Sequence, residues 1–235
     1  MARVLITGAG RGIGFELARQ YVERGDTVLA GARNPGGAYA LRQLQEQHKD
    51  RLTILPLEVA DGQSVDDCWH RAREVIDGLD LLINNAAINP GDAVKQPHGL
   101  LDSQLLLKVI EVNAAAPLLI AQRFHDLLRA GAAPRIINIS SGAGSLASID
   151  SGVPYIYSTS KAALNMLTRI LAFNVRDEGI IVVSLDPGWV RTDMGGVQAH
   201  LAPEESVSSI QRVVDRLTLQ DTGRFLRYDG GGVPW

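Results

Sequence analysis

The chain has 235 residues, of which 46% are hydrophobic and 21% are charged, and its formal net charge is −3. This composition is typical of a globular protein and excludes a disordered chain, and the length fits one domain spanning residues 1–235. Because basic residues are not in excess, neither nucleic acid nor an anionic membrane surface is expected as the main partner.

The amino terminus and the cysteine content bear on location. Residues 1–10, MARVLITGAG, begin an apolar strand at once, which leaves no room for a signal peptide. No run of 18 uninterrupted apolar residues occurs, so no segment is expected to span a bilayer. The single cysteine, Cys68, permits no internal disulfide and fits a reducing compartment. We therefore expect a cytoplasmic protein.

Short apolar runs alternate with longer stretches of helical periodicity along the whole chain. The strand-like runs are RVLIT, TVLAGA, LTILPLEV, LDLLINNA, RIINIS and IIVVSLDPG, and a seventh strand is expected within FLRYDGGGVPW. Strands that are apolar throughout are buried on both faces, as in a parallel sheet covered by helices. The alternation predicts a doubly wound α/β (Rossmann) fold with a mostly parallel, about seven-stranded sheet. Ligands of such sheets bind beyond the carboxyl ends of the strands.

Glycines follow the first predicted strand. In VLITGAGRGIG, Gly8 comes directly after Thr7, and Gly10, Gly12 and Gly14 open a helix. Glycine lets the backbone turn sharply and approach a pyrophosphate, whose charge the helix amino terminus stabilises. Because this triad follows a strand and precedes a helix, it predicts a dinucleotide-binding loop.

The end of the second predicted strand indicates which dinucleotide is preferred. An acidic residue there would bond ribose hydroxyls and favour NAD(H), whereas an arginine would accommodate a 2′-phosphate. The sequence GARNP places Arg33 at this point, and Arg11 in the glycine loop is a second cation. Guanidinium groups bind phosphate through strong bidentate hydrogen bonds. We expect NADP(H) to be preferred, with NAD(H) possible; the alternative is that Arg33 is a solvated loop charge.

Five motifs occur in register: TGAGRGIG at 7–14, NNAA at 84–87, NISS at 138–141, YSTSK at 157–161 and PGWVRTDM at 187–194. With them the chain resembles the short-chain dehydrogenase/reductase family over its whole length. Within that family, GARNP, PGWVRTDMGG and the terminal YDGGGVPW are similar to the C-factor and sniffer-type carbonyl reductase subgroup.

The resemblance implies a catalytic tetrad of Asn113, Ser141, Tyr157 and Lys161. It also implies that Asn84 and Ala86 pack a loop beside the cofactor. The cofactor contacts that it implies, together with the two arginines above, are Gly8, Arg11, Gly12, Ile13, Gly14, Arg33, Glu58, Val59, Asn85, Ala86, Tyr157, Lys161, Pro187, Gly188, Val190 and Thr192. Glu58 stands where the family usually has aspartate, which puts its contact with adenine in doubt.

The spacing of Tyr157 and Lys161 suits proton transfer. Residues four apart share one face of a helix, so both side chains can point into one cleft. A free tyrosine has a pKa of about 10, and a neighbouring ammonium would lower it. Tyr157 is thus expected to donate a proton to a carbonyl oxygen, with Lys161 lowering its pKa and binding the nicotinamide ribose. Ser141 is expected to hold the substrate oxygen. Tyr155 lies off this face and is interpreted as a cleft-wall or packing residue.

Asn113 lies inside the apolar stretch LLLKVIEVNAAAPLLIA, four residues before Pro117. A buried asparagine and a proline are both unfavourable in a regular helix. We expect a kink that holds a proton-relay water leading to Lys161; the alternative is a helix irregularity with no catalytic role.

Three further expectations concern the rest of the chain. The histidines form no pair with metal-ligand spacing, so no metal is expected. By resemblance, a substrate lid is expected, centred on Met194 to Leu201. Trp235 is expected to pack near the cleft or at a subunit contact.

These features together predict an NADPH-dependent oxidoreductase that reduces an aldehyde or ketone to an alcohol. The alternative is a C-factor-like NAD(P)-binding signalling protein with little turnover. The expected partners are a small carbonyl or alcohol substrate and a second copy of the chain, as a homodimer or homotetramer formed through helices near 103–130 and 157–177. The sequence leaves the natural substrate and the direction of the reaction open.

Overall fold

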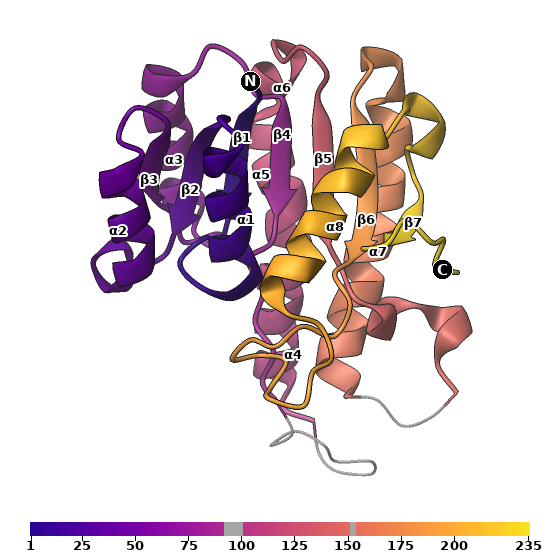
Figure 1. Cartoon of the computed structure of the whole chain (residues 1–235). Coiled ribbons are helices and arrows are strands. Elements are labelled where there is room, and N and C mark those ends of the chain that lie inside the picture. Colours follow the sequence, from indigo (N-terminus) through magenta and orange to yellow (C-terminus); the bar gives the residue numbers. More distant parts are fainter. Residues whose placement is uncertain (92–100, 151–153) are drawn as a thin grey trace.

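The computed structural model describes residues 1–91, 101–150 and 154–235. Its centre is a seven-stranded sheet in the order β3-β2-β1-β4-β5-β6-β7, and every pairing between these strands is parallel (Figure 1). The strands are β1 (Arg3–Thr7), β2 (Thr27–Ala32), β3 (Leu52–Pro56), β4 (Leu81–Asn84), β5 (Arg135–Ile139), β6 (Ile181–Asp186) and β7 (Phe225–Arg227). The predicted fold class and strand number are confirmed.

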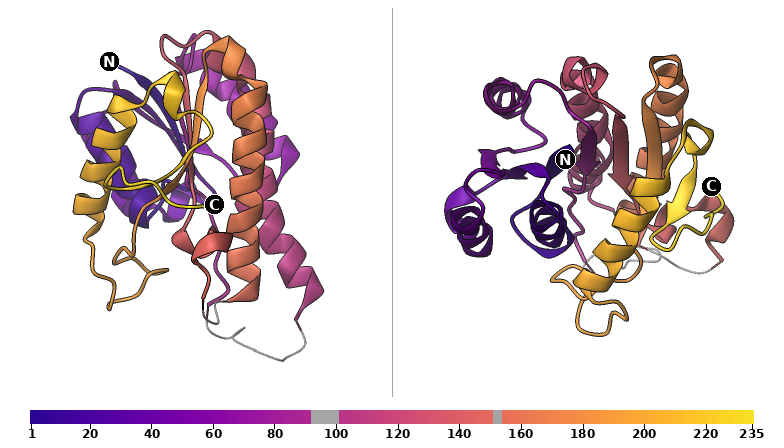
Figure 2. Two further views of the ribbon diagram at one scale, coloured as in Figure 1. Left: turned by 90° about the vertical axis from the view of Figure 1, so that its right-hand side faces the viewer. Right: turned by 45° about the horizontal axis from the view of Figure 1, so that its top comes forward.

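Helices cover both faces of the sheet (Figure 2). The helices are α1 (Gly12–Glu23), α2 (Tyr39–Gln47), α3 (Gly62–Val75), α4 (Ser103–Ile110), α5 (Ala116–Arg123), α6 (His125–Arg129), α7 (Tyr155–Asn174) and α8 (Pro203–Arg216). Apolar side chains of α1, α2 and α8 form one buried cluster with the strands, and those of α3, α5, α6 and α7 form another. The strands are thus buried on both faces, as their continuous apolar runs predict.

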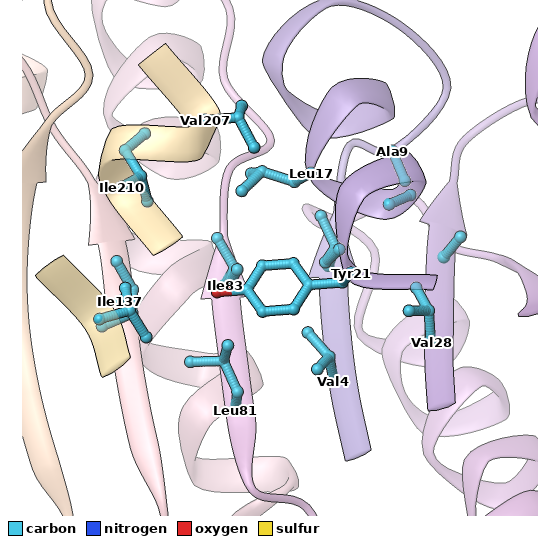
Figure 3. Close-up of a cluster of buried hydrophobic side chains, with 14 of the residues drawn as sticks. Val4, Ala9, Leu17, Tyr21, Val28, Leu81, Ile83, Ile137, Val207 and Ile210 are labelled. Atoms are coloured by element: carbon cyan, nitrogen blue, oxygen red, sulfur yellow. The ribbon is translucent and has the colours of Figure 1, made fainter. Parts of the chain in front are cut away.

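Tyr21 of α1 is a central member of the first cluster. Its side chain is fully buried, and its ring lies beside Val4 of β1 and Leu81 and Ile83 of β4 (Figure 3). This contact packs α1 against β1 and β4, the two strands between which the order of the sheet reverses. It therefore helps to place the amino end of α1, with its glycine loop, at the carboxyl edge of the sheet.

The stretch from Ser103 to Arg123 is long and apolar enough to cross a membrane, with a mean hydropathy of 1.5 in its most apolar window. In this structure α5 packs in the buried cluster with the strands and α4 packs on α7, with Val109, Val112 and Ile120 buried. This packing buries 44% of that window. The predicted irregularity is present as a π-helical turn at Glu111–Ala115.

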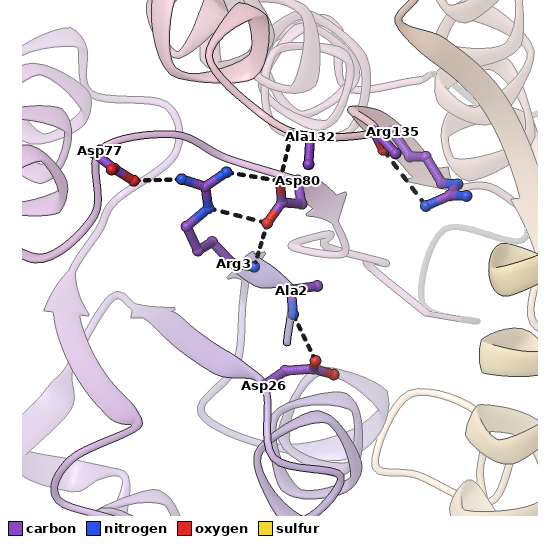
Figure 4. A network of polar contacts seen from close by, with 8 residues as sticks. Ala2, Arg3, Asp26, Asp77, Asp80, Ala132 and Arg135 are labelled. Atoms are coloured by element: carbon purple, nitrogen blue, oxygen red, sulfur yellow. Dashed lines mark hydrogen bonds and ion pairs between the residues drawn. The ribbon is translucent and has the colours of Figure 1, made fainter.

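A polar network holds the opposite, amino-terminal edge of the central strands (Figure 4). The Asp80 carboxylate accepts hydrogen bonds from the backbone and guanidinium of Arg3, at 2.8 to 3.0 Å, and from the Ala132 amide at 2.8 Å. Burial alone would raise the pKa of Asp80, but the hydrogen bonds from Arg3 and Ala132 outweigh it and hold the pKa at about 2. Asp77 pairs with the same guanidinium from an exposed position.

Replacing Asp80 with asparagine should lower the free energy of unfolding by roughly 2 kcal/mol at neutral pH, as the difference between pKa values of 3.8 and about 2 implies. This contribution is fully present above pH 3.8, the unfolded-state value, and is lost as the pH falls through about 2. Urea unfolding of wild type and Asp80→Asn across this range measures it. Asp77→Asn is the control, with a much smaller effect expected because its side chain is 93% exposed. A loss of stability that did not change with pH would contradict the assignment.

Candidate active site

A cavity of about 830 Å³ lies beyond the carboxyl ends of the strands. Its wall is built from the glycine loop, the segments that follow β2 to β6, and α7. All but one of the residues expected to contact cofactor or substrate line it: Gly8, Arg11, Gly12, Ile13, Gly14, Arg33, Glu58, Val59, Asn85, Ala86, Ser141, Tyr157, Lys161, Pro187, Gly188, Val190 and Thr192. The exception is Asn113, which is not among the described residues of the wall.

The glycine loop needs glycine for space as well as conformation. Gly8 and Gly12 have positive φ angles of 67° and 57°. A Cβ atom on Gly14 would lie 2.2 Å from the carbonyl oxygen of Gly8, and one on Gly8 would lie 2.8 Å from the Cα of Ala86. Only a bare backbone therefore fits at this edge, and it leaves the amino end of α1 open to the cavity.

The two asparagines of the NNAA motif have different partners, and only Asn85 braces the glycine loop. Asn85 donates from Nδ2 to the carbonyl oxygens of Thr7 and Gly8, at 3.0 and 3.2 Å. Asn84 is buried and is not among the described residues of the wall; it donates to Oδ1 of Asn138 at 2.8 Å. The expectation that Asn84 packs a loop beside the cofactor is wrong in this structure, because its amide joins β4 to β5 inside the sheet.

Two guanidinium groups stand at one end of the cavity. The side chains of Arg11 and Arg33 are 77% and 74% exposed. Arg11 pairs with Asp193 at 3.1 Å, and Arg33 lies 3.8 Å from the carboxylate of Glu58. Both pairs are exposed and therefore weak, so an anion entering the cavity can compete for either arginine.

Lys161 lies at the other end, where α7 meets the end of β5. Its side chain is almost completely buried, and Nζ donates to the carbonyl oxygen of Ile139 at 2.8 Å. The same Nζ is 5.7 Å from the ring centre of Tyr157. Gly144 allows this approach, because a Cβ atom there would lie 2.7 Å from the backbone of Lys161. Ser141 follows β5, and its Oγ accepts from the Ala143 amide at 3.2 Å.

The electrostatics of this group differ from the expectation. Burial raises the pKa of the half-buried Tyr157 to about 12; the hydroxyl of Ser141 acts to lower it and the Asp186 carboxylate to raise it. Burial lowers the pKa of Lys161 to about 8, and Asp186 opposes that shift. The expected lowering of the Tyr157 pKa by Lys161 is therefore wrong for this structure. The reason is that the ammonium is directed to the Ile139 carbonyl, so desolvation of the phenol dominates.

Asn113 satisfies all of its amide groups within the protein. Its Oδ1 accepts from the Ile88 amide at 2.8 Å, and Nδ2 donates to the Ile88 carbonyl at 2.9 Å and to Oγ of Ser160 at 3.0 Å. Ser160 in turn donates to the backbone carbonyl of Tyr157 at 2.7 Å. The π-helical turn thus joins the segment after β4 to the helix that carries Tyr157.

Sequence reasoning missed Asp186, the last residue of β6. Its carboxylate lines the cavity and accepts from the Gly188 amide at 3.0 Å. Burial raises its pKa, against hydrogen bonds from the backbone of Gly188 and Gly142. An acidic residue at the carboxyl end of a buried strand was the signal that could have identified it.

The segment expected to form the lid is a loop held together by its own hydrogen bonds. Val190 and Leu201 form a bridge, and Nε1 of Trp189 donates to the Gly195 carbonyl at 2.8 Å. Residues 189–195 contribute Trp189, Val190, Thr192, Asp193, Met194 and Gly195 to the cavity wall. In the described part of the wall, this loop is represented by residues from 189–195 only. The lid was expected to centre further along the chain, on Met194 to Leu201.

Two other sequence-based interpretations concern Tyr155 and metal binding. Tyr155 is 53% exposed and does not line the described part of the cavity, so it is not a cleft-wall residue there. Within residues 1–91, 101–150 and 154–235, no group of three histidine, cysteine, aspartate or glutamate side chains is placed to hold a metal ion.

Comparisons with known proteins agree with this architecture. A family model described as short chain dehydrogenase matches residues 2–200. The chain is 40% identical to the C-signal of Myxococcus xanthus over 157 residues, which cover 67% of this chain and 93% of that protein. It is similar to the NADPH-bound carbonyl reductase from chicken fatty liver, with 36% identity, a TM-score of 0.93, and coverage of 100% of this chain and 99% of that one. It is also similar to the carbonyl reductase Sniffer of D. melanogaster, with 32% identity and a TM-score of 0.94 over the full length of both chains.

Proposed function

The chain belongs to the short-chain dehydrogenase family and is thereby an oxidoreductase, and we propose that it reduces an aldehyde or ketone to an alcohol with NADPH. The observation that carries this proposal is the meeting of Ser141, Tyr157 and Lys161 at one end of a cavity that has a glycine loop and two arginines at the other. A dinucleotide needs both ends at once, since its phosphates and its nicotinamide are far apart. The likeness to an NADPH-bound carbonyl reductase supports the same assignment.

The residues of the wall fit NADPH. Side chains at Gly8 and Gly14 would collide with Ala86 and with the Gly8 carbonyl, so glycine allows the tight loop whose helix amino terminus would hold a pyrophosphate. Arg11 and Arg33 are exposed cations that would hold a 2′-phosphate, and Glu58 beside Arg33 is near enough to share that guanidinium. Lys161 would bind the nicotinamide ribose, and Pro187, Gly188, Val190 and Thr192 would contact the nicotinamide half. NAD(H) remains a possible second cofactor.

When bound, NADPH supplies the hydride that adds to the carbonyl carbon. Ser141 would donate a hydrogen bond to the carbonyl oxygen and stabilise the negative charge that develops there. Tyr157 would then transfer its phenolic proton to this oxygen. With its pKa raised to about 12, the phenol is protonated at neutral pH and so is in the form that can act as an acid.

The phenolate left on Tyr157 must regain a proton, and Lys161 is the neighbouring acid that can stabilise it. Because the pKa of Lys161 is lowered to about 8, its ammonium gives up a proton more readily than a solvated lysine does. Asn113 is proposed to support a relay water. Both hydrogens of its amide nitrogen are already donated to protein, so Oδ1, which accepts from Ile88, would have to accept from that water through its second lone pair.

The wall near Tyr157 indicates the kind of substrate. Ile88, Trp189 and Met194 present apolar surface to the cavity. Apart from Lys161, the cationic side chains on the described wall are Arg11, which is paired with Asp193, and Arg33, which follows the more distant strand β2. We therefore propose a neutral carbonyl compound of small or medium size.

The similarity to C-signal makes a signalling role the second candidate function. A protein that only bound a dinucleotide would have no need for a serine, a buried lysine and a neutral phenol around one point of the cavity. The catalytic proposal therefore accounts for more of the structure. Loss of turnover in Tyr157→Phe, which removes one oxygen atom, would distinguish an enzyme from a protein that only binds the dinucleotide.

Replacing Tyr157 with phenylalanine should lower kcat for NADPH-dependent carbonyl reduction by about 10²- to 10⁴-fold, because the proton donor is removed. NADPH oxidation with a panel of aldehydes, diketones and quinones measures this effect, and NADPH fluorescence measures cofactor binding, which should be retained. Tyr155→Phe is the matched control and should keep wild-type activity, since Tyr155 lies outside the described wall. Activity of Tyr157→Phe within a few-fold of wild type would exclude the proposed acid.

Replacing Arg33 with aspartate should reduce the preference for NADPH over NADH by about 10- to 100-fold, because a charge-assisted phosphate contact is replaced by repulsion. The measurement is kcat/KM for each cofactor with one carbonyl substrate. Arg42→Asp is the control, because it makes the same change in net charge at an exposed position of α2 outside the described wall. It should leave the cofactor preference unchanged. An unchanged preference in Arg33→Asp would remove Arg33 from the phosphate site.

We also propose a homodimer or homotetramer. Met166, Ile170 and Phe173 of α7 are at least half exposed, and Leu107 of α4 and Leu119 of α5 add to the apolar surface of these adjoining helices. Light scattering should give a mass of two or four times 25.3 kDa. A mass of one chain at micromolar concentration would contradict this proposal. The cytoplasmic location stays a prediction.

A further inference from the structure

Ser141 lies on a loop that would have to be held in place for the proposed chemistry. The loop runs from Ser140 to Ser148 and contains two short 3₁₀ turns, Gly142–Gly144 and Leu146–Ser148. The Ser141 hydroxyl accepts a local hydrogen bond from the Ala143 amide at 3.2 Å, and it also acts on the Tyr157 hydroxyl inside the cavity. Its position therefore depends on what holds the rest of the loop.

On its inner side the loop is held by α7. Oδ1 of Asn165 accepts from Oγ of Ser140 at 2.6 Å, and Nδ2 donates to the carbonyl of Gly144 at 3.1 Å. Gly144 also packs directly on the backbone of Lys161. These contacts fix the two ends of the first 3₁₀ turn against the helix that carries Tyr157.

On its outer side the loop is held by the segment Val233–Trp235, here called the tail clamp. Ser145 is completely buried, and its Oγ donates to the Pro234 carbonyl at 2.6 Å. The Ala147 amide donates to the Trp235 carbonyl at 2.9 Å. Two neighbouring points of the loop are thus bonded to main-chain carbonyls of the tail clamp.

The tail clamp is itself anchored on β7. The Val233 amide donates to the carbonyl of Phe225 at 2.9 Å, and the Trp235 ring stacks on the Phe225 ring with 5.5 Å between centroids. The guanidinium of Arg169, on α7, lies 5.3 Å from the centre of the Trp235 ring. Trp235 therefore contacts both the edge strand β7 and the helix α7. The carboxyl end of the chain lies near β7 in Figure 1.

We propose that Ser145 and Trp235 are positioning residues, which hold the Ser141 loop from outside so that the Ser141 hydroxyl meets the substrate oxygen beside Tyr157. The inference rests on the proposed function of that site. It assigns to Trp235 a role within its own chain, by way of the loop, rather than direct contact with the substrate. A displacement of about 1 Å at an oxygen-binding group can reduce a rate by about 100-fold.

Steady-state kinetics of Trp235→Ala test the proposal. We expect kcat for the best carbonyl substrate to fall about 10-fold or more, and the Kd for NADPH to stay within twofold, since the tail clamp lies away from the cofactor half of the cavity. Trp235→Phe keeps the stack on Phe225 and should restore most of kcat. Tyr39→Ala removes an exposed aromatic ring on α2 and is the control for a general loss of stability.

Ser145→Ala is the second variant: it removes the bond to the Pro234 carbonyl together with the bonds of the same hydroxyl to Ser148 within the loop, and it leaves the aromatic stack intact. It should lower kcat in the same direction, and it keeps the proposal testable if Trp235→Ala fails to fold. Wild-type kcat in both Ser145→Ala and a folded Trp235→Ala would overturn the proposal. So would a fall in kcat that Trp235→Phe did not restore.

Hydrogen exchange of the peptide covering residues 140–148 separates this inference from the proposed function, because it requires no turnover. Exchange in this peptide should rise in Trp235→Ala and in Ser145→Ala relative to wild type. Unchanged exchange would overturn the tail clamp even if the wild type reduces carbonyl compounds. If the wild type proves inactive on every carbonyl while exchange still rises, the proposed function fails and the catalytic role of the clamp fails with it.

Discussion

The burial of Lys161 is the constraint on which the rest of the site depends. An ammonium that is almost completely shielded from water requires an acceptor, and this one donates to the Ile139 carbonyl at 2.8 Å, while the charge of the Asp186 carboxylate favours its protonated form. Ile139 and Asp186 end the adjacent strands β5 and β6. Lys161 can therefore occupy this position only if α7 packs closely on the end of the sheet. Gly144 makes that packing possible, because any side chain there would collide with the backbone of Lys161.

The same close packing places the other groups of the site. Once α7 lies against the loop after β5, Ser141 and Tyr157 line one wall without direct help from the cofactor. Asn165 and the π-helical turn then fasten α7 on two further sides, through Ser140 and through Ser160. The site is thus preorganised by contacts outside the cavity, which is how a protein can hold reacting groups in place without paying for their order during the reaction. The glycine loop at the other end follows the same principle, since its shape depends on β4 through Asn85.

Departures from the sequence-based expectations arise where a distant contact decides a local property. Lys161 was expected to lower the pKa of Tyr157, but desolvation of the phenol has the larger effect while the ammonium is directed to Ile139. A neutral phenol is still suited to the reductive direction, in which it acts as the acid. Asn84 was expected to pack a loop beside the cofactor, but its amide joins Asn138 inside the sheet. In both cases the residue type and its element were predicted, and the direction of the side chain was not.

The sequence by itself determined the elements and the order in which they meet the cavity. Apolar β-branched runs can be satisfied only by burial on both faces, glycine spacing admits a close backbone turn, and a four-residue interval places Tyr157 and Lys161 on one helix face. All of these are local properties of the chain. Only the tertiary structure decided that the charge of Asp186 acts on Lys161, that Asn113 is satisfied by Ile88, and that Trp235 stacks on Phe225 beside the Ser141 loop. Those pairings join separate segments of the chain, and they depend on the exact approach of packed surfaces, which no local pattern of residues specifies.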